Sequence, residues 1–273
     1  MRTLLVIALS LFVAGSALAD TLRFEGRVEA VRQAELSSQL NGIVAEILFS
    51  GGEYVEAGRP MIRLDRADAD VALAVADAHV AQAEAELEGA TSEANRQETL
   101  FQRGISPDAV VAPARTAKAA AEAALALARA ERRRARLDRD RTLIRAPISG
   151  FVGQPLTRVG AFLEAESQAP LAEIVALDEL VIAYRVPYAT RLETLQNSGA
   201  KSLDALLERI ELAFDLPDGS RFPHGATPSH ASATVDPADG TVAVRAKVRN
   251  PDAILRPGMA LTVHVTILPS ETQ

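Results

Sequence analysis

The stretch NGIVAEILFSGGEYV at residues 41–55 returns in similar form as SGFVGQPLTRVGAFL at residues 149–163. In each copy two glycines stand ten residues apart and an apolar residue follows the second by three: Gly42, Gly52 and Val55, then Gly150, Gly160 and Leu163. Glycines spaced in this way among apolar residues are typical of short strands joined by tight turns. We therefore predict one small β-unit made twice, with these four glycines at its structural turns and with Val44 and Val152 in its core.

The segment between the two copies has the composition of a helix. Residues 66–103 contain no proline and a single glycine, which predicts a helix of about 38 residues, about 55 Å long. Its apolar residues alternate three- and four-residue steps, the pattern of a two-helix seam: Leu73, Ala76, Val80, Ala83, Leu87, Ala90 and Ala94. The following segment offers a matching set of alanines: Ala114, Ala121, Ala128 and Ala135, with Ala117 and Ala124 between them. An antiparallel helical hairpin is predicted.

A short turn separates the two predicted helices. Gly104 suits the left-handed position after a helix, Ser106 suits an N-cap, and Pro107 suits the first position of the next helix. Pro113 removes a backbone hydrogen bond from the second helix, so either that helix kinks there or its regular part begins there.

Strand patterns lie outside the repeated unit as well. Residues 21–31 alternate apolar and polar side chains, which predicts a strand. The C-terminal segment predicts strands at 180–186, 233–235, 242–248 and 260–267, a short helix at 189–196 and a hairpin turn at Asp218 and Gly219. Because the first strand has no partner in the repeated unit, we expect it to pair with this C-terminal segment, which would nest the two-copy unit inside a barrel.

The N-terminus reads as a secretory signal. A short apolar run is followed by small residues ending in Ala19, after which cleavage is predicted; a retained anchor helix is the competing interpretation. The chain contains no cysteine, so neither a disulfide nor a lipid-anchored cysteine is expected. Without residues 1–19 the chain carries 28 basic and 36 acidic residues, a formal charge of −8, which argues against nucleic acid as a partner.

No pattern predicts catalysis, a cofactor or a metal. A biotinyl or lipoyl carrier needs a lysine on the turn that joins its two halves, but here the helical segment replaces that turn and Lys118 falls on a helix, where a solvated charge is expected. Ser149 has no histidine near it in sequence to activate it as a nucleophile. The four histidines, His79, His224, His230 and His264, are scattered along the chain. The only metal hypothesis is a chance ion between His224 and His230, which share a Pro/Ser-rich loop.

The order of these parts resembles the periplasmic adaptors, or membrane fusion proteins, of tripartite efflux pumps. The most specific pieces are residues 145–152, the paired stretch around Gly42, and the segment from Asp236 through Asn250 to Met259. The last of these is similar to the barrel of adaptors that serve resistance-nodulation-division (RND) transporters. The resemblance covers essentially the whole chain after the signal. It implies an elongated, multidomain α+β protein with a β-barrel, a lipoyl-like β-sandwich and an antiparallel α-helical coiled-coil hairpin.

The resemblance divides the chain into nested domains. The expected parts are a signal peptide at 1–19, a β-barrel domain at 20–33 and 176–268, a lipoyl-like domain at 34–65 and 142–175, a helical hairpin at 66–141, and a tail at 269–273. Many family members have a fourth, membrane-proximal domain built from both termini, and here it is expected to be absent or rudimentary.

The implied function is mechanical. Such an adaptor links an inner-membrane, proton-driven RND-type transporter to an outer-membrane channel and seals the conduit, with copies forming a ring of six in the periplasm. The family's hairpin-tip residues fall on Arg96, Leu100 and Ser106, which the resemblance places against the channel. The alternative is structural: Ser106 caps a helix, Leu100 closes the seam and Arg96 lies in solvent.

Other functions remain open at this point. An adaptor for an ATP-driven exporter or a type I secretion system would share the hairpin and lipoyl-like parts. A periplasmic coiled-coil holdase chaperone would need apolar patches along the rod, whereas alanine and charged residues dominate it.

Overall fold

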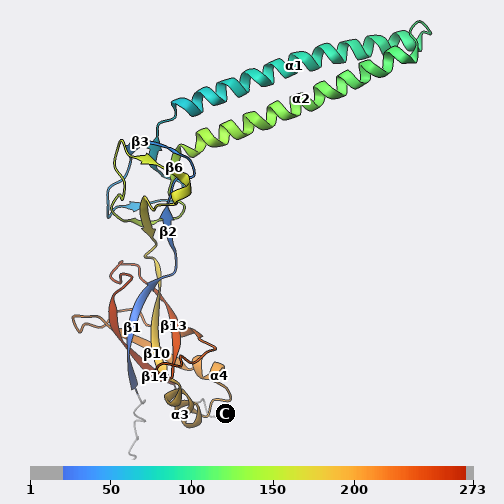
Figure 1. Ribbon diagram of the computed structural model, residues 1–273. Coiled ribbons are helices and arrows are strands. Elements are labelled where there is room, and N and C mark those ends of the chain that lie inside the picture. The colour runs from blue at the N-terminus through green and yellow to red at the C-terminus, as the bar shows by residue number, and fades with distance from the viewer. Residues whose placement is uncertain (1–20, 269–273) are drawn as a thin grey trace, which may run out of the picture. The chain divides into compact units, whose positions relative to one another are not determined.

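The computed structural model describes residues 21–268 (Figure 1). The predicted signal at residues 1–19 and the tail at 269–273 lie outside the described residues. Contacts divide the chain into two compact units, one of residues 32–176 and one that combines the residues up to 31 with those from 177 onward. Among the described helices, none is both long and apolar enough to cross a membrane.

The unit of residues 32–176 contains one β-sandwich made by both copies of the repeat. Its strands are β2 (Gln33–Leu36), β3 (Gly42–Ile47), β4 (Tyr54–Val55), β5 (Pro60–Leu64), β6 (Leu143–Arg145), β7 (Gly150–Val152), β8 (Phe162–Leu163) and β9 (Ala172–Val175), with a 3-10 turn η1 at Ala165–Ser167. The sheets run β2-β9-β7-β4 and β6-β5-β3-β8, so each takes two strands from each half. Equivalent strands occupy equivalent places in the two sheets, which confirms the predicted two-copy sandwich.

The sandwich core lies between these two sheets. Val44 and Val152, predicted as core residues, are both almost fully buried, as are Val55 and Ile174. Burying an aliphatic side chain of this size stabilises a fold by about 1.5–3 kcal/mol. Since residues of both halves form a single cluster, neither half has a complete core of its own.

The repeated glycines have two different roles. Gly52 and Gly160 adopt the left-handed backbone, with φ of 88° and 84°, as expected for tight turns. Gly42 and Gly150, also assigned to turns, instead begin strands β3 and β7. A Cβ on Gly150 would lie 2.5 Å from the carbonyl oxygen of Val175, so a close backbone approach requires glycine at that position.

The hairpin consists of α1 (Ala67–Gln102) and α2 (Asp108–Arg141), which run side by side (Figure 1). The bounds of α1 agree with the predicted helix to within one residue at each end. Helix α2 continues through Pro113 from Asp108 onward, so its regular part does not begin at the proline. The hairpin leaves the sandwich between β5 and β6, which pair with each other.

The second unit is built on a six-stranded sheet in the order β11-β14-β1-β10-β13-β12. Its strands are β1 (Thr21–Ala30), β10 (Glu179–Pro187), β11 (Ile210–Asp215), β12 (Pro228–Ala231), β13 (Thr241–Arg249) and β14 (Ala260–Ile267). Strand β1 pairs with both β10 and β14, which confirms that the first strand joins the C-terminal segment. Two helices complete the unit, α3 (Tyr188–Ser198) and the short α4 (Leu203–Leu207).

Three details of this unit differ from the sequence prediction. Strand β11 (Ile210–Asp215) lies where no strand was predicted. Residues 233–235 do not form a strand; the strand of this region is β12, a few residues earlier. Here the hydroxyl of Ser232 accepts a hydrogen bond from the amide of Thr234, a local turn that competes with a strand ladder. Helix α4 was not predicted, because five residues are too few for a helical periodicity to appear.

Candidate functional site

The α1 side of the hairpin seam is as predicted. Ala76, Val80, Ala83 and Ala94 are buried, and the remaining predicted positions are half-buried. Small side chains at these contacts let the two helices approach closely along their length. The hairpin is therefore a closely packed pair of helices that ends in the turn at residues 103–107.

The α2 side of the seam corrects one prediction. Its buried and half-buried positions are Val111, Ala114, Lys118, Ala121, Leu125, Ala128, Arg132, Ala135, Asp138 and Arg139. Ala117 and Ala124, predicted between the heptad alanines, are exposed. In an alanine-rich helix several registers look alike, and the larger side chains of Val111 and Leu125 decide which one is buried. Lys118 consequently lies at the seam, partly covered and near Glu122, rather than on a fully solvated face.

Ion pairs between the helices follow the same register. Acids of α1 meet arginines of α2: Glu84 with Arg129 at 2.9 Å, Asp70 with Arg139 at 2.7 Å, and Glu98 with Arg115 at 3.0 Å. The hydrogen bond from Arg139 to Asp70 raises the pKa of that guanidinium. Exposed pairs stabilise a fold by less than about 1 kcal/mol each, so their main effect is to favour one alignment of the two helices.

The turn at the hairpin tip has a well-defined backbone. Gly104 is left-handed, with φ of 74°, as predicted. Its amide donates to Phe101 O at 2.8 Å, and the amide of Ile105 donates to Leu100 O at 2.9 Å. These two bonds form a Schellman motif, which satisfies the last carbonyls of α1.

Ser106 does not cap α2 as predicted. The N-cap is Pro107, and no side chain accepts a capping hydrogen bond. The Ser106 hydroxyl instead donates to Gln97 Oε1 at 3.2 Å, which ties the turn back to α1. Pro107 thus stands one position earlier than predicted.

The three residues assigned to the tip lie at the end of α1 and in the turn. Arg96 is exposed and forms an ion pair with Glu93. Leu100 is half-buried, and its carbonyl also accepts a hydrogen bond from the amide of Ser106. Arg96 and Leu100 are four residues apart on one helix and so share a face.

The tip also presents apolar side chains that the sequence argument did not single out. Ile105 is 68% exposed, and Phe101 and Val110 are exposed as well. Their apolar character is visible in the sequence on both sides of Gly104, but only the structure shows that they point away from the seam. Exposed apolar side chains of this kind are suited to contact another protein.

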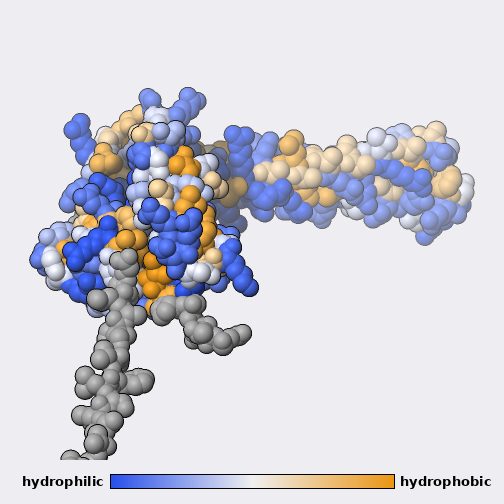
Figure 2. Space-filling model, turned by 90° about the horizontal axis from the view of Figure 1, so that it is seen from below, coloured by the Kyte–Doolittle hydropathy of each residue, from blue (hydrophilic) through white to orange (hydrophobic). Residues whose placement is uncertain are grey.

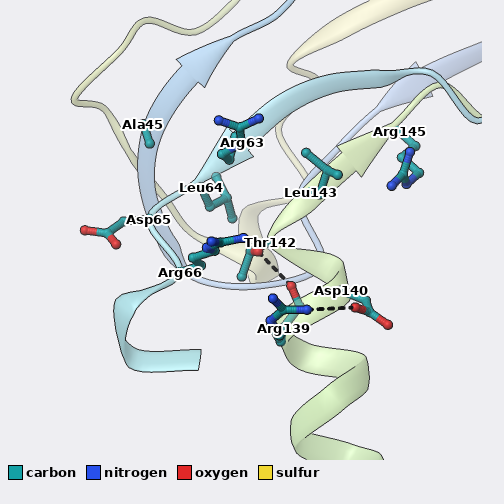
Figure 3. A pocket seen from close by; sticks show the side chains of 10 residues that line it. All are labelled: Ala45, Arg63, Leu64, Asp65, Arg66, Arg139, Asp140, Thr142, Leu143 and Arg145. Carbon is teal, nitrogen blue, oxygen red and sulfur yellow. Dashed lines mark hydrogen bonds and ion pairs between the residues drawn. The ribbon is translucent and has the colours of Figure 1, made fainter. Parts of the chain in front are cut away.

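The base of the hairpin holds a cavity of about 790 Å³ (Figure 3). Charged side chains from β5, the segment between β5 and α1, the end of α2 and β6 line it, and several of them are already paired. Asp70 binds both Arg66 and Arg139, Arg63 binds Glu46, and the Thr142 hydroxyl donates to Arg139 O. This arrangement anchors the hairpin to the sandwich.

Nothing in residues 21–268 brings three metal-binding side chains together. His79 faces Glu131, His264 bonds to Asp215 at 2.5 Å, and the ring of His224 packs against Phe222. His230 lies in strand β12.

Comparison with known proteins agrees with this architecture. The family described as "RND MFP, barrel-sandwich hybrid domain" matches residues 32–175, and "RND MFPs, beta-barrel domain" matches residues 192–268. Among curated proteins, the membrane fusion protein MtrC of Neisseria gonorrhoeae is 31% identical over 89% of this chain and 59% of its own length. The multidrug efflux pump subunit AcrA of Escherichia coli K12 is 30% identical over 88% of this chain and 60% of its own length.

A solved structure shows the same fold. The membrane fusion protein Spr0693 of Streptococcus pneumoniae R6 superposes with a TM-score of 0.64 and 18% identity, covering 90% of this chain and 99% of that one. The chain spans about 60% of the length of the curated relatives it matches. On its sandwich, its barrel and these matches, the chain belongs to the membrane fusion proteins of RND systems.

Proposed function

We propose that the protein is the periplasmic adaptor subunit of a tripartite efflux pump, linking an inner-membrane, proton-driven RND-type transporter to an outer-membrane channel. The observation that carries the proposal is the long two-helix hairpin with an exposed tip, inserted into a sandwich of the RND membrane fusion family. Curated relatives named as efflux pump periplasmic linkers, such as SrpA of Pseudomonas putida, support it.

The proposal assigns a mechanical role to each part. The tip, with Arg96, Leu100 and Ser106, meets the outer-membrane channel. The lipoyl-like domain (34–65 and 142–175) and the barrel domain (20–33 and 176–268) seal the conduit between copies in a ring of six. These bounds lie within two residues of the divisions between the two compact units. No catalytic residue or cofactor is assigned, and the mature chain is placed in the periplasm after cleavage behind Ala19.

Placing a negative charge at the hairpin tip tests this function. A strain that lacks the gene is complemented with Arg96→Asp or Leu100→Asp, and susceptibility to a panel of efflux substrates is measured. Both variants are expected to be as susceptible as the deletion strain. Arg96→Asp removes the basic group of the tip, and Leu100→Asp adds a charge where the proposed contact is apolar. Circular dichroism and the amount of secreted protein should match the wild type.

Matched changes away from the tip serve as controls. Arg134 and Leu127 of α2 are also exposed, so Arg134→Asp and Leu127→Asp repeat the same chemistry on the rod and should preserve export. Full resistance in the tip variants would contradict the proposed contact. So would an equal loss of resistance in the rod variants.

A further inference from the structure

The loop between β13 and β14 is held at both of its ends. At its start, Asn250 is 2% exposed. Its side-chain amide donates to the carbonyl oxygens of Leu177 and Leu255, and its side-chain oxygen accepts from the amide of Leu255. At its end, the amide of Gly258 donates to the carbonyl oxygen of Val28 in β1 at 2.8 Å. These bonds fix the backbone on either side of residues 251–254.

One residue of this loop has an unfavourable backbone. Ala253 is left-handed, with φ of 49°, where a side chain is strained and glycine is not. Its amide donates to Asn250 O at 3.1 Å, which closes a tight turn. A residue other than glycine keeps this backbone where the surrounding structure imposes it, and such residues gather at functional sites. The strain therefore directs attention to what the turn presents.

The turn presents an isoleucine to solvent. Ile254 is 41% exposed, whereas Leu255, the next residue, is fully buried and anchors the chain. The loop lies at the end of the sheet away from α3, because β10 leads into α3 and runs antiparallel to β13. Figure 2 looks at the unit from the other end, where apolar surface lies among hydrophilic groups. Ile254 is therefore a separate apolar group, and a strained, pinned backbone holds it outward.

The outer face of the sheet beside this loop is basic. Three exposed cations, Arg245, Lys247 and Arg249, alternate with buried residues along β13. The charged residues at the matching register on β10 and β1 are Glu179, Arg27 and Glu29. This basic face thus holds four basic and two acidic side chains, on a chain whose formal charge is −7. A local reversal of sign attracts an acidic partner and repels a basic one.

We propose that Ile254 and the basic face dock the barrel unit onto an acidic surface of the inner-membrane transporter. The inference rests on the proposed function, which makes the transporter the partner, and it names the surface that the barrel uses. Ile254 supplies an apolar anchor whose backbone is already ordered, so little conformational entropy is lost on binding. Lys247 and Arg249 supply the charge around it. A single isoleucine inserts too little apolar area to bind a lipid surface stably.

Photocrosslinking in cells tests this surface. A photoreactive phenylalanine analogue replaces Ile254 in the full chain, in a strain that lacks the wild-type gene, and mass spectrometry identifies the crosslinked peptides. The expected product joins position 254 to a periplasmic segment of an RND-type transporter, with acidic residues in that segment. The same analogue in place of Val235, which is also 41% exposed, should not give this product.

Reversal of the charges tests the basic face. Lys247→Glu combined with Arg249→Glu should lower the yield of the crosslink by about fivefold or more. A lysine in place of an acidic residue of the crosslinked transporter segment should restore it. Lys201→Glu, at an exposed lysine of the same unit, should leave the yield unchanged.

Relief of the strain tests the ordered turn. Ala253→Gly should keep or raise the melting temperature, because glycine adopts the left-handed backbone without strain. It should nevertheless lower the crosslink yield severalfold, because the freer loop loses more entropy on binding.

Several outcomes would overturn the inference. They are a crosslink from position 254 to a second copy of this chain or to lipid, no crosslink at all, or equal yields in the Lys247 and Arg249 double variant and the wild type. Failure of the proposed function is a different result, because it would appear as full resistance in the Arg96→Asp and Leu100→Asp strains.

Discussion

At the scale of single residues, the structure separates constraints that look identical in the sequence. Gly52 and Gly160 need a left-handed backbone, and Gly104 does so at the hairpin tip. All three roles could be predicted, because glycine adopts this backbone at the least cost after a helix or at a turn between apolar runs. The role of Ser106 could not, since a hydroxyl near a helix start can bond to the helix ahead of it or to the one behind.

The paired glycines Gly42 and Gly150 give a matched stability test. Gly150→Ala should lower the free energy of unfolding by about 2 kcal/mol, because its methyl group would collide with the Val175 carbonyl. Gly42→Ala should stay within about 1 kcal/mol of the wild type, since its methyl group would find only the Leu64 side chain at 3.4 Å. Urea unfolding of the two variants measures the difference, and equal losses would argue against the inferred backbone approach.

An exposed ion-pair cluster gives a pH prediction. The hydrogen bond from Arg185 to Asp236 at 2.8 Å lowers the pKa of that carboxyl group. A carboxyl whose pKa is lower in the folded state stabilises the fold above its unfolded pKa, and this contribution is lost as pH falls through the folded pKa. Arg185→Met should raise the pKa of Asp236 in an NMR titration. An unchanged titration would show that Arg185 is not the cause.

At the scale of elements, agreement with the sequence follows the strength of the pattern. Both hairpin helices and the strands β1, β13 and β14 could be placed to within a residue or two, because each has a long periodic run. The seam of α2 was assigned partly wrongly, since alanine is apolar in every register. Short elements such as β12 and α4 depend on local turns and on packing against distant residues, which a single sequence does not display.

The corrected seam predicts which leucine of α2 supports the hairpin. Leu125 is 6% exposed and Leu127 is 63% exposed, although both lie in the same alanine-rich run. Leu125→Ala should destabilise the hairpin by about 2–3 kcal/mol through loss of buried contacts, whereas Leu127→Ala should change stability by less than about 0.5 kcal/mol. Thermal unfolding followed by circular dichroism at 222 nm compares them. A larger loss at Leu127 would contradict the assigned seam.

At the scale of the whole molecule, two units are each built from separate parts of the chain. Residues 32–176 enclose the hairpin within a sandwich, and the barrel unit joins the first described strand to the C-terminal segment. This nesting was visible in the sequence because the two copies of the repeat flank the helical segment. The exposed apolar side chains of the tip were not visible, because exposure depends on the folded chain.

A disulfide between the two halves of the repeat, within one sheet of the sandwich, tests the central claim, that both halves form one body around the hairpin. The chain has no cysteine, and Tyr54 of β4 pairs with Phe151 of β7. Tyr54→Cys combined with Phe151→Cys, with a protease site placed in the hairpin turn, should give two fragments that stay linked on a non-reducing denaturing gel. The control pair, Tyr54→Cys with Phe162→Cys, joins edge strands of different sheets and should separate on cleavage. Separation of the first pair, or linkage of the control instead, would contradict the shared sandwich.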